Sequence, residues 1–184
     1  MKDYKISLTG DIGSGKSTIG QILSEKYNLE KISIGYILRD MASEYGMDVN
    51  AFNTYMETHP EIDNILDNKL KEYENKSGKF LFDSRLAWHF VPSSFSVYIK
   101  VSTKTAAERI MGAGRSSEIY KSLDEAVESI NARHESELLR YKTLYNLDLS
   151  DLSNYDLVVD TDGKSPTEIA GIICTAFETW LEQK

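Results

Sequence analysis

The stretch Gly10-Asp11-Ile12-Gly13-Ser14-Gly15-Lys16-Ser17 constrains this chain more than any other, because it satisfies the pattern G-x-x-x-x-G-K-[ST] at every fixed position. The alternating segment 4–9 precedes it and predicts a β-strand, and segment 18–27 follows it with apolar residues at helical spacing. A strand, a glycine-rich turn and a helix form the context in which this motif binds phosphate. A turn that binds nothing is the alternative, and the flanking elements argue against it.

The residue types of this loop have chemical reasons. Glycines let backbone N–H groups point at phosphate oxygens, and the helix that follows adds its positive end. Lys16 is predicted to reach the β- and γ-phosphates of a nucleotide, and the Ser17 hydroxyl to ligate Mg²⁺. The predicted nucleotide-binding residues are Gly10, Asp11, Ile12, Gly13, Ser14, Gly15, Lys16, Ser17 and Thr18.

Strands and helices alternate along the rest of the chain, which predicts an α/β fold with a parallel sheet covered by helices on both faces. Four further strands are predicted within 28–34, 79–82, 95–101 and 155–160. Three helical pieces between the second and third strands exceed what a crossover needs and predict a helical flap, 35–77. Glycines before a long polar helix predict a short flexible lid, 111–122. The 184 residues show no repeat or linker, so we expect one domain, 1–184.

Composition and charge narrow the range of partners. The net charge of −8 argues against sequence-independent binding of a nucleic acid polymer, which requires a basic surface. Cys174 is the only cysteine, so no internal disulfide is expected. The start of the chain lacks the apolar stretch of a signal peptide, and no run approaches the roughly 18 apolar residues of a membrane span. We therefore expect a cytoplasmic monomer with no membrane partner.

Arginines outside the loop are candidates for holding a second phosphate group. Phosphoryl transfer between two anions requires positive charge that aligns donor and acceptor, and a guanidinium matches two phosphate oxygens at once. The candidates are Arg39, Arg85, Arg109, Arg115, Arg133 and Arg140. Arg39 is followed by Asp40 and could instead form a solvated ion pair. Arg109 and Arg115 border the glycine-rich stretch, and a structural role for them is equally open.

The positions of two further groups of candidate residues lead to different predictions, a ligand site for one and an exposed surface for the other. Asp83 and Arg85 follow the third strand at its carboxyl end, where ligands of open α/β sheets bind. Asp83 could join the Mg²⁺ shell, accept a hydrogen bond from the substrate, or only cap a helix. Arg133, Glu137 and Arg140 share one helix face, and their spacing alone favours an exposed, salt-bridged surface.

The ordered set of motifs resembles the cytidylate kinase family, and within it the short archaeal-type branch. The matching segments are the phosphate loop and residues 33–39, 60–63, 83–88, 107–110, 133–141 and 148–161. The resemblance implies the P-loop NTPase fold, with a five-stranded parallel sheet, a flap for the nucleoside monophosphate and a mobile lid. It also implies transfer of the γ-phosphoryl group of ATP, with Mg²⁺, to a small-molecule acceptor that is most plausibly CMP or dCMP.

The resemblance further implies roles for individual residues. The residues implied to act on the transferring phosphates are Lys16, Arg109, Arg115 and Arg140. The residues implied to bind the acceptor are Ser33, Arg39, Asp83, Arg85, Arg133 and Glu137, and the metal pair is Ser17 with Asp83. Bacterial members carry Asp-Gly-Arg-Asp after the third strand, where this chain has Ser84 in place of glycine and Leu86 in place of the second acid. Base recognition is therefore left open.

Three rival functions remain. The nearest is a small-molecule kinase of the same architecture with a different acceptor. A nucleotide-dependent switch or assembly ATPase would give a conformational change as its output, and the short chain and surplus of arginines argue against it. A degenerate binding module is the third, and the intact Lys16-Ser17 pair argues against it.

Overall fold

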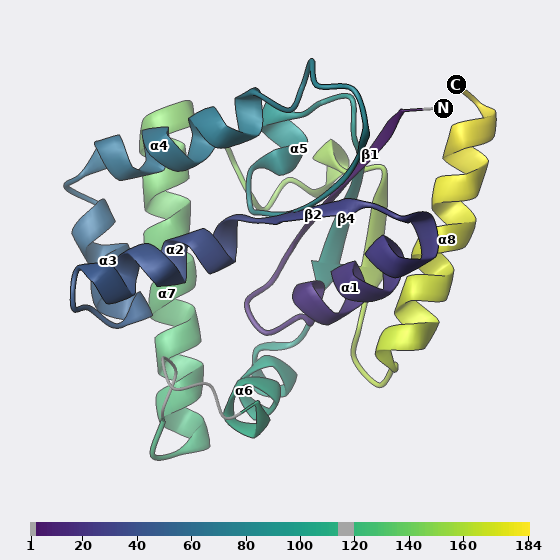
Figure 1. The fold of residues 1–184 in the computed structure, drawn as a ribbon. Helices are drawn as coiled ribbons and strands as arrows, with labels where there is room; N and C mark the ends of the chain where they lie inside the picture. The colour runs from purple at the N-terminus through teal and green to yellow at the C-terminus, as the bar shows by residue number, and fades with distance from the viewer. Residues whose placement is uncertain (1–2, 114–119) are drawn as a thin grey trace.

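A five-stranded sheet with the order β2-β3-β1-β4-β5 forms the centre of the computed structural model, which describes residues 3–113 and 120–184 (Figure 1). The strands are β1 (Tyr4–Gly10), β2 (Glu30–Ser33), β3 (Lys79–Asp83), β4 (Phe95–Lys100) and β5 (Leu157–Asp160). Every pairing is parallel, so all five carboxyl ends lie at the same edge of the sheet. The predicted parallel α/β fold is confirmed.

Alternation along the strands explains how one face of the sheet is covered. Ile6 and Leu8 of β1 pair in register with Leu81 of β3 and Val97 of β4, and all four side chains are fully buried. They form one core with apolar residues of α1 (Lys16–Tyr27) and α8 (Pro166–Glu182), which also pack against each other. Burial of this shared apolar surface is what holds the two helices to the sheet.

The opposite face carries small polar and aromatic side chains. The Ser94 hydroxyl donates to the Ser7 hydroxyl at 3.0 Å, which satisfies both groups between the strands. Phe80 and Phe82 of β3 pack against Leu70 and Val91. A short helix, α5 (Ala87–Phe90), lies against β1 on this face and was not predicted. The sheet therefore has helices on both sides, as expected.

The fifth strand begins two residues later than predicted. The carboxylate of Asp156 accepts the backbone N–H of Ser96 at 2.7 Å and its hydroxyl at 2.8 Å. The backbone N–H of Asp156 in turn donates to the Ser96 hydroxyl at 3.0 Å, so side chains take part in every one of these bonds and regular backbone pairing starts only at Leu157. A single 3₁₀ turn, η1 (Leu152–Asn154), precedes it.

Three helices connect β2 to β3, namely α2 (Ile34–Glu44), α3 (Val49–Met56) and α4 (Pro60–Lys71). They share a core of their own, which includes the buried Phe52 and Met56. Asp48 caps α3 by accepting the backbone N–H of Ala51 at 2.8 Å, and Pro60 occupies the first position of α4. This group of helices stands beside the long α7 (Leu123–Tyr145) in Figure 1. Its function as a movable flap stays a prediction.

Helix α6 (Thr103–Gly112) packs against α7, and each begins at a serine cap, Ser102 and Ser122. Most of the predicted lid, 111–122, lies between the two helices. Residues 114–119, and with them the candidate Arg115, lie outside the described residues. Within 3–113 and 120–184, no helix has the length and apolar character needed to cross a membrane.

Candidate active site

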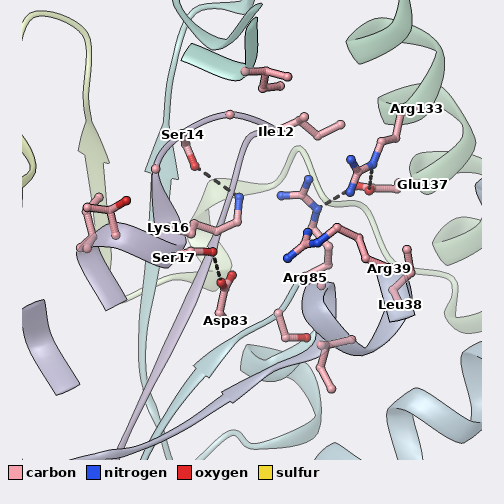
Figure 2. Close-up of a pocket in the computed structure, with 18 of the residues that line it drawn as sticks. Ile12, Ser14, Lys16, Ser17, Leu38, Arg39, Asp83, Arg85, Arg133 and Glu137 are labelled. Atoms are coloured by element: carbon pink, nitrogen blue, oxygen red, sulfur yellow. Dashed lines mark hydrogen bonds and ion pairs between the residues drawn. The ribbon is translucent and has the colours of Figure 1, made fainter. Parts of the chain in front are cut away.

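The phosphate loop joins β1 to α1 at the edge where the strands end (Figure 2). Asp11 turns away from the loop interior. Its Oδ1 accepts the Tyr98 hydroxyl at 2.6 Å and its Oδ2 accepts the Val101 backbone N–H at 2.8 Å. The Asp11 side chain therefore attaches the loop to β4. Of Asp11, only the backbone stays a candidate for nucleotide binding.

Two of the loop glycines are required by packing within the protein. Gly10 has a φ of 146°, and a Cβ there would lie 2.1 Å from the carbonyl oxygen of Ile99. Gly13 has a φ of 75°, and its Cβ would lie 2.9 Å from backbone atoms of Ala106 on α6. The sequence predicts glycines here because a phosphate must approach the backbone. The structure shows a second reason, since β4 lies close to Gly10 and α6 lies close to Gly13.

Lys16 lies across the inside of the loop. Its ammonium donates to the carbonyl oxygens of Gly10 at 2.9 Å and Asp11 at 2.7 Å, and to the hydroxyl of Ser14 at 3.3 Å. Burial and, after it, the nearby guanidinium of Arg85 lower the pKa of Lys16 to about 7. A phosphate bound here would offset both effects, because its charge favours the ammonium form.

Ser17 and Asp83 meet at the carboxyl ends of β1 and β3. The Ser17 hydroxyl donates to Oδ2 of Asp83 at 2.7 Å (Figure 2). A hydroxyl and a carboxylate beside a phosphate-binding loop are oxygen ligands of the kind that Mg²⁺ takes. The donor set therefore fits the predicted metal.

Glu137 holds two arginines from different parts of the chain. Arg85, which follows β3, donates through Nε to Oε2 of Glu137 at 2.8 Å, and Arg133, one turn earlier on α7, reaches Oε1 at 3.3 Å (Figure 2). Burial opposes ionisation of Glu137, but Arg85, Arg133 and Arg140 outweigh it and lower its pKa to about 2. The face of α7 is thus not the exposed salt-bridged surface that spacing alone favoured.

One cavity of about 440 Å³ joins the loop to this arginine cluster. The predicted residues that line it are Ile12, Gly13, Ser14, Gly15, Lys16, Ser17, Thr18, Arg39, Asp83, Arg85, Arg109, Arg133 and Glu137. The strand order divides the lining in two. Residues after β2 and β3, such as Leu38 and Arg85, lie on one side of the central β1, and Arg109 and Lys164, after β4 and β5, lie on the other.

Arg109 lies on the β4–β5 side in a fixed position. Its two terminal nitrogens donate to the hydroxyl and the carbonyl oxygen of Thr161, both at 2.9 Å. Because Thr161 follows β5 directly, the guanidinium is anchored to the sheet edge and not to the lid. It still lines the cavity, so contact with a phosphate remains a prediction for this residue.

Ser33 and Arg140, two predicted site residues, are absent from the described lining of the cavity. Ser33 caps α2, where its hydroxyl accepts the Tyr36 backbone N–H at 3.3 Å. Arg140 is buried against the flap helices: it donates to Oδ1 of Asn53 at 3.0 Å and lies 3.2 Å from Oδ2 of Asp63. Contact between Arg140 and a transferring phosphate would require this pairing to open.

Sequence reasoning missed several residues that line the cavity, above all two acids of α4. Asp63 and Asp67 are four residues apart and both are buried. The signal was present, because they lie next to the apolar residues Ile62 and Leu66 on the helix face that turns inward. Tyr141 of α7 also lines the cavity, although its spacing from Tyr145 suggested only helix support.

Comparison with known proteins identifies relatives across the whole chain. A family model described as an AAA domain matches residues 6–140. The cytidylate kinase of Methanocaldococcus jannaschii is 36% identical over 178 residues, covering 94% of this chain and 97% of that protein. The cytidylate kinase of Methanosarcina barkeri is 35% identical, covering 95% and 97%.

One relative is much longer than this chain. The S-adenosylmethionine-dependent nucleotide dehydratase of Lacinutrix mariniflava is 35% identical over 175 residues, which are 95% of this chain and 36% of that protein. The chain therefore spans about a third of that relative.

Two solved structures agree on the fold. Shikimate kinase from Bacteroides thetaiotaomicron has a TM-score of 0.65 at 16% identity, covering 96% of this chain and 99% of that one. Deoxyadenosine kinase from M. mycoides with bound dATP has a TM-score of 0.55 at 22% identity, covering 95% and 99%. These likenesses show the architecture of a P-loop kinase. Together with the archaeal relatives, they show that the chain belongs to the cytidylate kinase family and is a phosphotransferase.

Proposed function

We propose that this protein is a nucleoside monophosphate kinase that transfers the γ-phosphoryl group of ATP to CMP or dCMP. The observation that carries the proposal is the single cavity that connects the phosphate loop to the buried arginines held by Glu137. A protein that only binds or hydrolyses one nucleotide does not need a second cationic cluster across from the loop. The family membership supports the same conclusion.

The donor nucleotide occupies the loop and the β4–β5 side of the cavity. Loop N–H groups and Lys16 hold the β- and γ-phosphates, while Arg109 and Lys164 line the space beyond the loop on that side. Ser17 and Asp83 would hold Mg²⁺, which when bound neutralises charge on the phosphates.

The acceptor occupies the β2–β3 side, beneath the flap helices. Its phosphate meets Arg39, Arg85 and Arg133, which line that part of the cavity and can bind phosphate oxygens in pairs. The attacking atom is an oxygen of the acceptor phosphate, which is already ionised near neutral pH, so no side chain is needed to remove a proton. The residues act by alignment and by charge stabilisation.

The proposal is tested by measuring ADP formation from ATP and Mg²⁺ with CMP, dCMP, UMP, AMP and GMP supplied one at a time, beside a control without acceptor. Strong stimulation by CMP or dCMP is the expected result. Equal and weak turnover in every tube would overturn the acceptor assignment and favour a different acceptor or a nucleotide-driven switch.

A further inference from the structure

Asp67 is a buried acid of the cavity wall that the proposed mechanism does not use. It lies on α4, only 5% of its surface is exposed, and it lines the acceptor side of the cavity. Its one hydrogen bond among residues 3–113 and 120–184 is to the Tyr145 hydroxyl, which reaches Oδ2. The other oxygen, Oδ1, therefore has no hydrogen-bond partner within the described chain. Because Asp67 lines the cavity, this second oxygen can accept a hydrogen bond from a ligand bound there.

Tyr145 fixes how this carboxylate is presented. Burial and the neighbouring Asp67 raise the pKa of Tyr145, so the phenol keeps its proton and must donate it to Oδ2. The ring itself is held at the end of α7 by edge contact with Phe90, at 5.5 Å between ring centres. The phenol occupies one oxygen, and the other is left for a donor in the cavity.

Asp63, one turn away, is different because it already has a cationic partner. Its Oδ2 lies 3.2 Å from Nε of Arg140, within an ion pair that is buried on both sides. Among residues 3–113 and 120–184, no arginine forms an ion pair with Asp67. Burial, and after it the Asp63 carboxylate, raises the pKa of Asp67 to about 6, although the Tyr145 hydroxyl, Lys71 and Arg140 act in the opposite direction. The charge of Asp67 is thus only partly compensated.

The surroundings of Asp67 suit a base and not a phosphate. A carboxylate repels phosphate, and the arginines that attract phosphate are Arg39, Arg85 and Arg133. The wall between them and α4 is apolar, with Ile34, Leu38, Leu66 and Leu86 among the lining residues. Ligand sites of this kind have mostly apolar walls with a few polar groups that fix orientation, and here the acids Asp63 and Asp67 are among those polar groups.

We propose that Asp67, oriented by Tyr145, accepts a hydrogen bond from the exocyclic amine of the acceptor base and so selects cytosine over uracil. This inference rests on the proposed function. Cytosine carries an amine donor at its 4-position, where uracil carries a carbonyl acceptor that a carboxylate repels. The acid absent after Arg85, where Leu86 stands, is thereby replaced by an acid from α4.

The test compares kcat/KM for CMP and for UMP in the wild type and in Asp67→Asn. With the Tyr145 hydroxyl on its carbonyl oxygen, the new amide presents N–H groups to the cavity, which oppose the cytosine amine and match the uracil carbonyl. We expect the CMP-to-UMP ratio to fall at least about tenfold, as one base-edge hydrogen bond allows. Tyr145→Phe should lower the ratio less, because it frees the carboxylate to rotate without removing it.

Glu72→Gln is the matched control, since it removes the same charge from an exposed position at the end of α4 and should leave the ratio unchanged. Thermal unfolding verifies that each variant is folded, and CMP binding without ATP gives a second readout that does not depend on turnover. An unchanged ratio in folded Asp67→Asn, or a wild type that uses CMP and UMP equally, overturns this inference alone. A wild type that phosphorylates no nucleoside monophosphate overturns the proposed function instead.

Discussion

Glu137 and Asp67 are two buried carboxylates that line one cavity, and their surroundings shift their pKa values in opposite directions. Glu137, on the phosphate side, accepts from Arg85 and Arg133, and its pKa is lowered to about 2. Asp67, on the flap helix α4, accepts a hydrogen bond from the Tyr145 hydroxyl alone among the described residues, and its pKa is raised to about 6. The same chemical group is therefore stabilised as an anion at one end of the cavity and destabilised as an anion at the other.

The difference indicates what each end is prepared to bind. Around Glu137 the protein gathers more positive charge than the carboxylate neutralises, and the excess is available to a phosphate. Around Asp67 the excess is negative, and a neutral donor such as an amine relieves it. Under the proposed function, this charge distribution would orient an acceptor nucleotide with its phosphate toward Arg85 and Arg133 and its base toward α4.

Removing the carboxylate at the cationic end gives the largest expected effect. In Glu137→Gln the partly buried Arg85 and Arg133 lose the counter-charge of a buried carboxylate, and breaking a buried ion pair costs up to about 3–5 kcal/mol of unfolding free energy. Urea unfolding at pH 7 measures the loss. Glu135→Gln, at an exposed position of the same helix, should change stability by less than about 0.5 kcal/mol. Equal effects for the two variants would mean that the arginines do not depend on Glu137.

The phosphate loop should give the largest loss of activity. Lys16→Ala removes a charge aimed at the transferring phosphates, and kcat should fall about 10²–10³-fold, equal to about 2.7–4 kcal/mol. Steady-state kinetics with the preferred acceptor measures this, with the exposed Lys104→Ala as the control. A kcat within about tenfold of the wild type would show that the loop is not the donor site.

A substitution of Arg39 distinguishes the proposed acceptor side of the cavity from the proposed donor side, because it should change the KM of only one substrate. Arg39→Ala should raise the KM for the monophosphate about tenfold, or about 1.4 kcal/mol, because one charged contact to the acceptor is lost. The KM for ATP should stay nearly constant, since the donor lies across β1. An increase in the KM for ATP with no change for the monophosphate would contradict the assignment of sides.

The smallest expected effect is a gain in stability at the anionic end. The raised pKa of Asp67 means that the folded protein loses stability as pH rises from about 3.8 to about 6, because Tyr145, Lys71 and Arg140 together do not offset burial and the nearby Asp63 carboxylate. Asp67→Asn should therefore be about 1 kcal/mol more stable than the wild type at pH 8 and no more stable at pH 4. Thermal unfolding of both proteins across this pH range measures the sign of the stability difference. An Asp67→Asn variant that is less stable than the wild type at pH 8 would show that the Asp67 anion is not destabilised in the folded protein.

Local patterns predicted the fold because each depends on neighbouring residues only. The loop motif and the apolar strands are properties of short segments, and the strand and helix predicted on either side of the loop are present. Helix α5 escaped notice because four residues are too few to show a helical period. The late start of β5 depends on a side-chain contact between Asp156 and Ser96, which are 60 residues apart.

The site was less predictable, because it depends on which face each helix presents to the cavity. Spacing placed Arg133, Glu137 and Arg140 on one face of α7 but could not show that Arg140 points at α3 and α4 while Arg133 points at the cavity. Asp67 was overlooked because an acid beside an apolar stripe usually marks the boundary with solvent. In the structure it is buried, and its partner, the Tyr145 hydroxyl, comes from α7, which is distant in sequence.

The buried contact of Arg140 with Asn53 and Asp63 has a mechanical consequence. It fastens α3 and α4 to the same turn of α7 that presents Glu137 to the cavity. Under the proposed function, a movement of α3 and α4 toward a bound base would therefore also act on α7, which carries Arg133 and Glu137. Binding of the base at one end of the acceptor would in this way be coupled to the position of its phosphate at the other end.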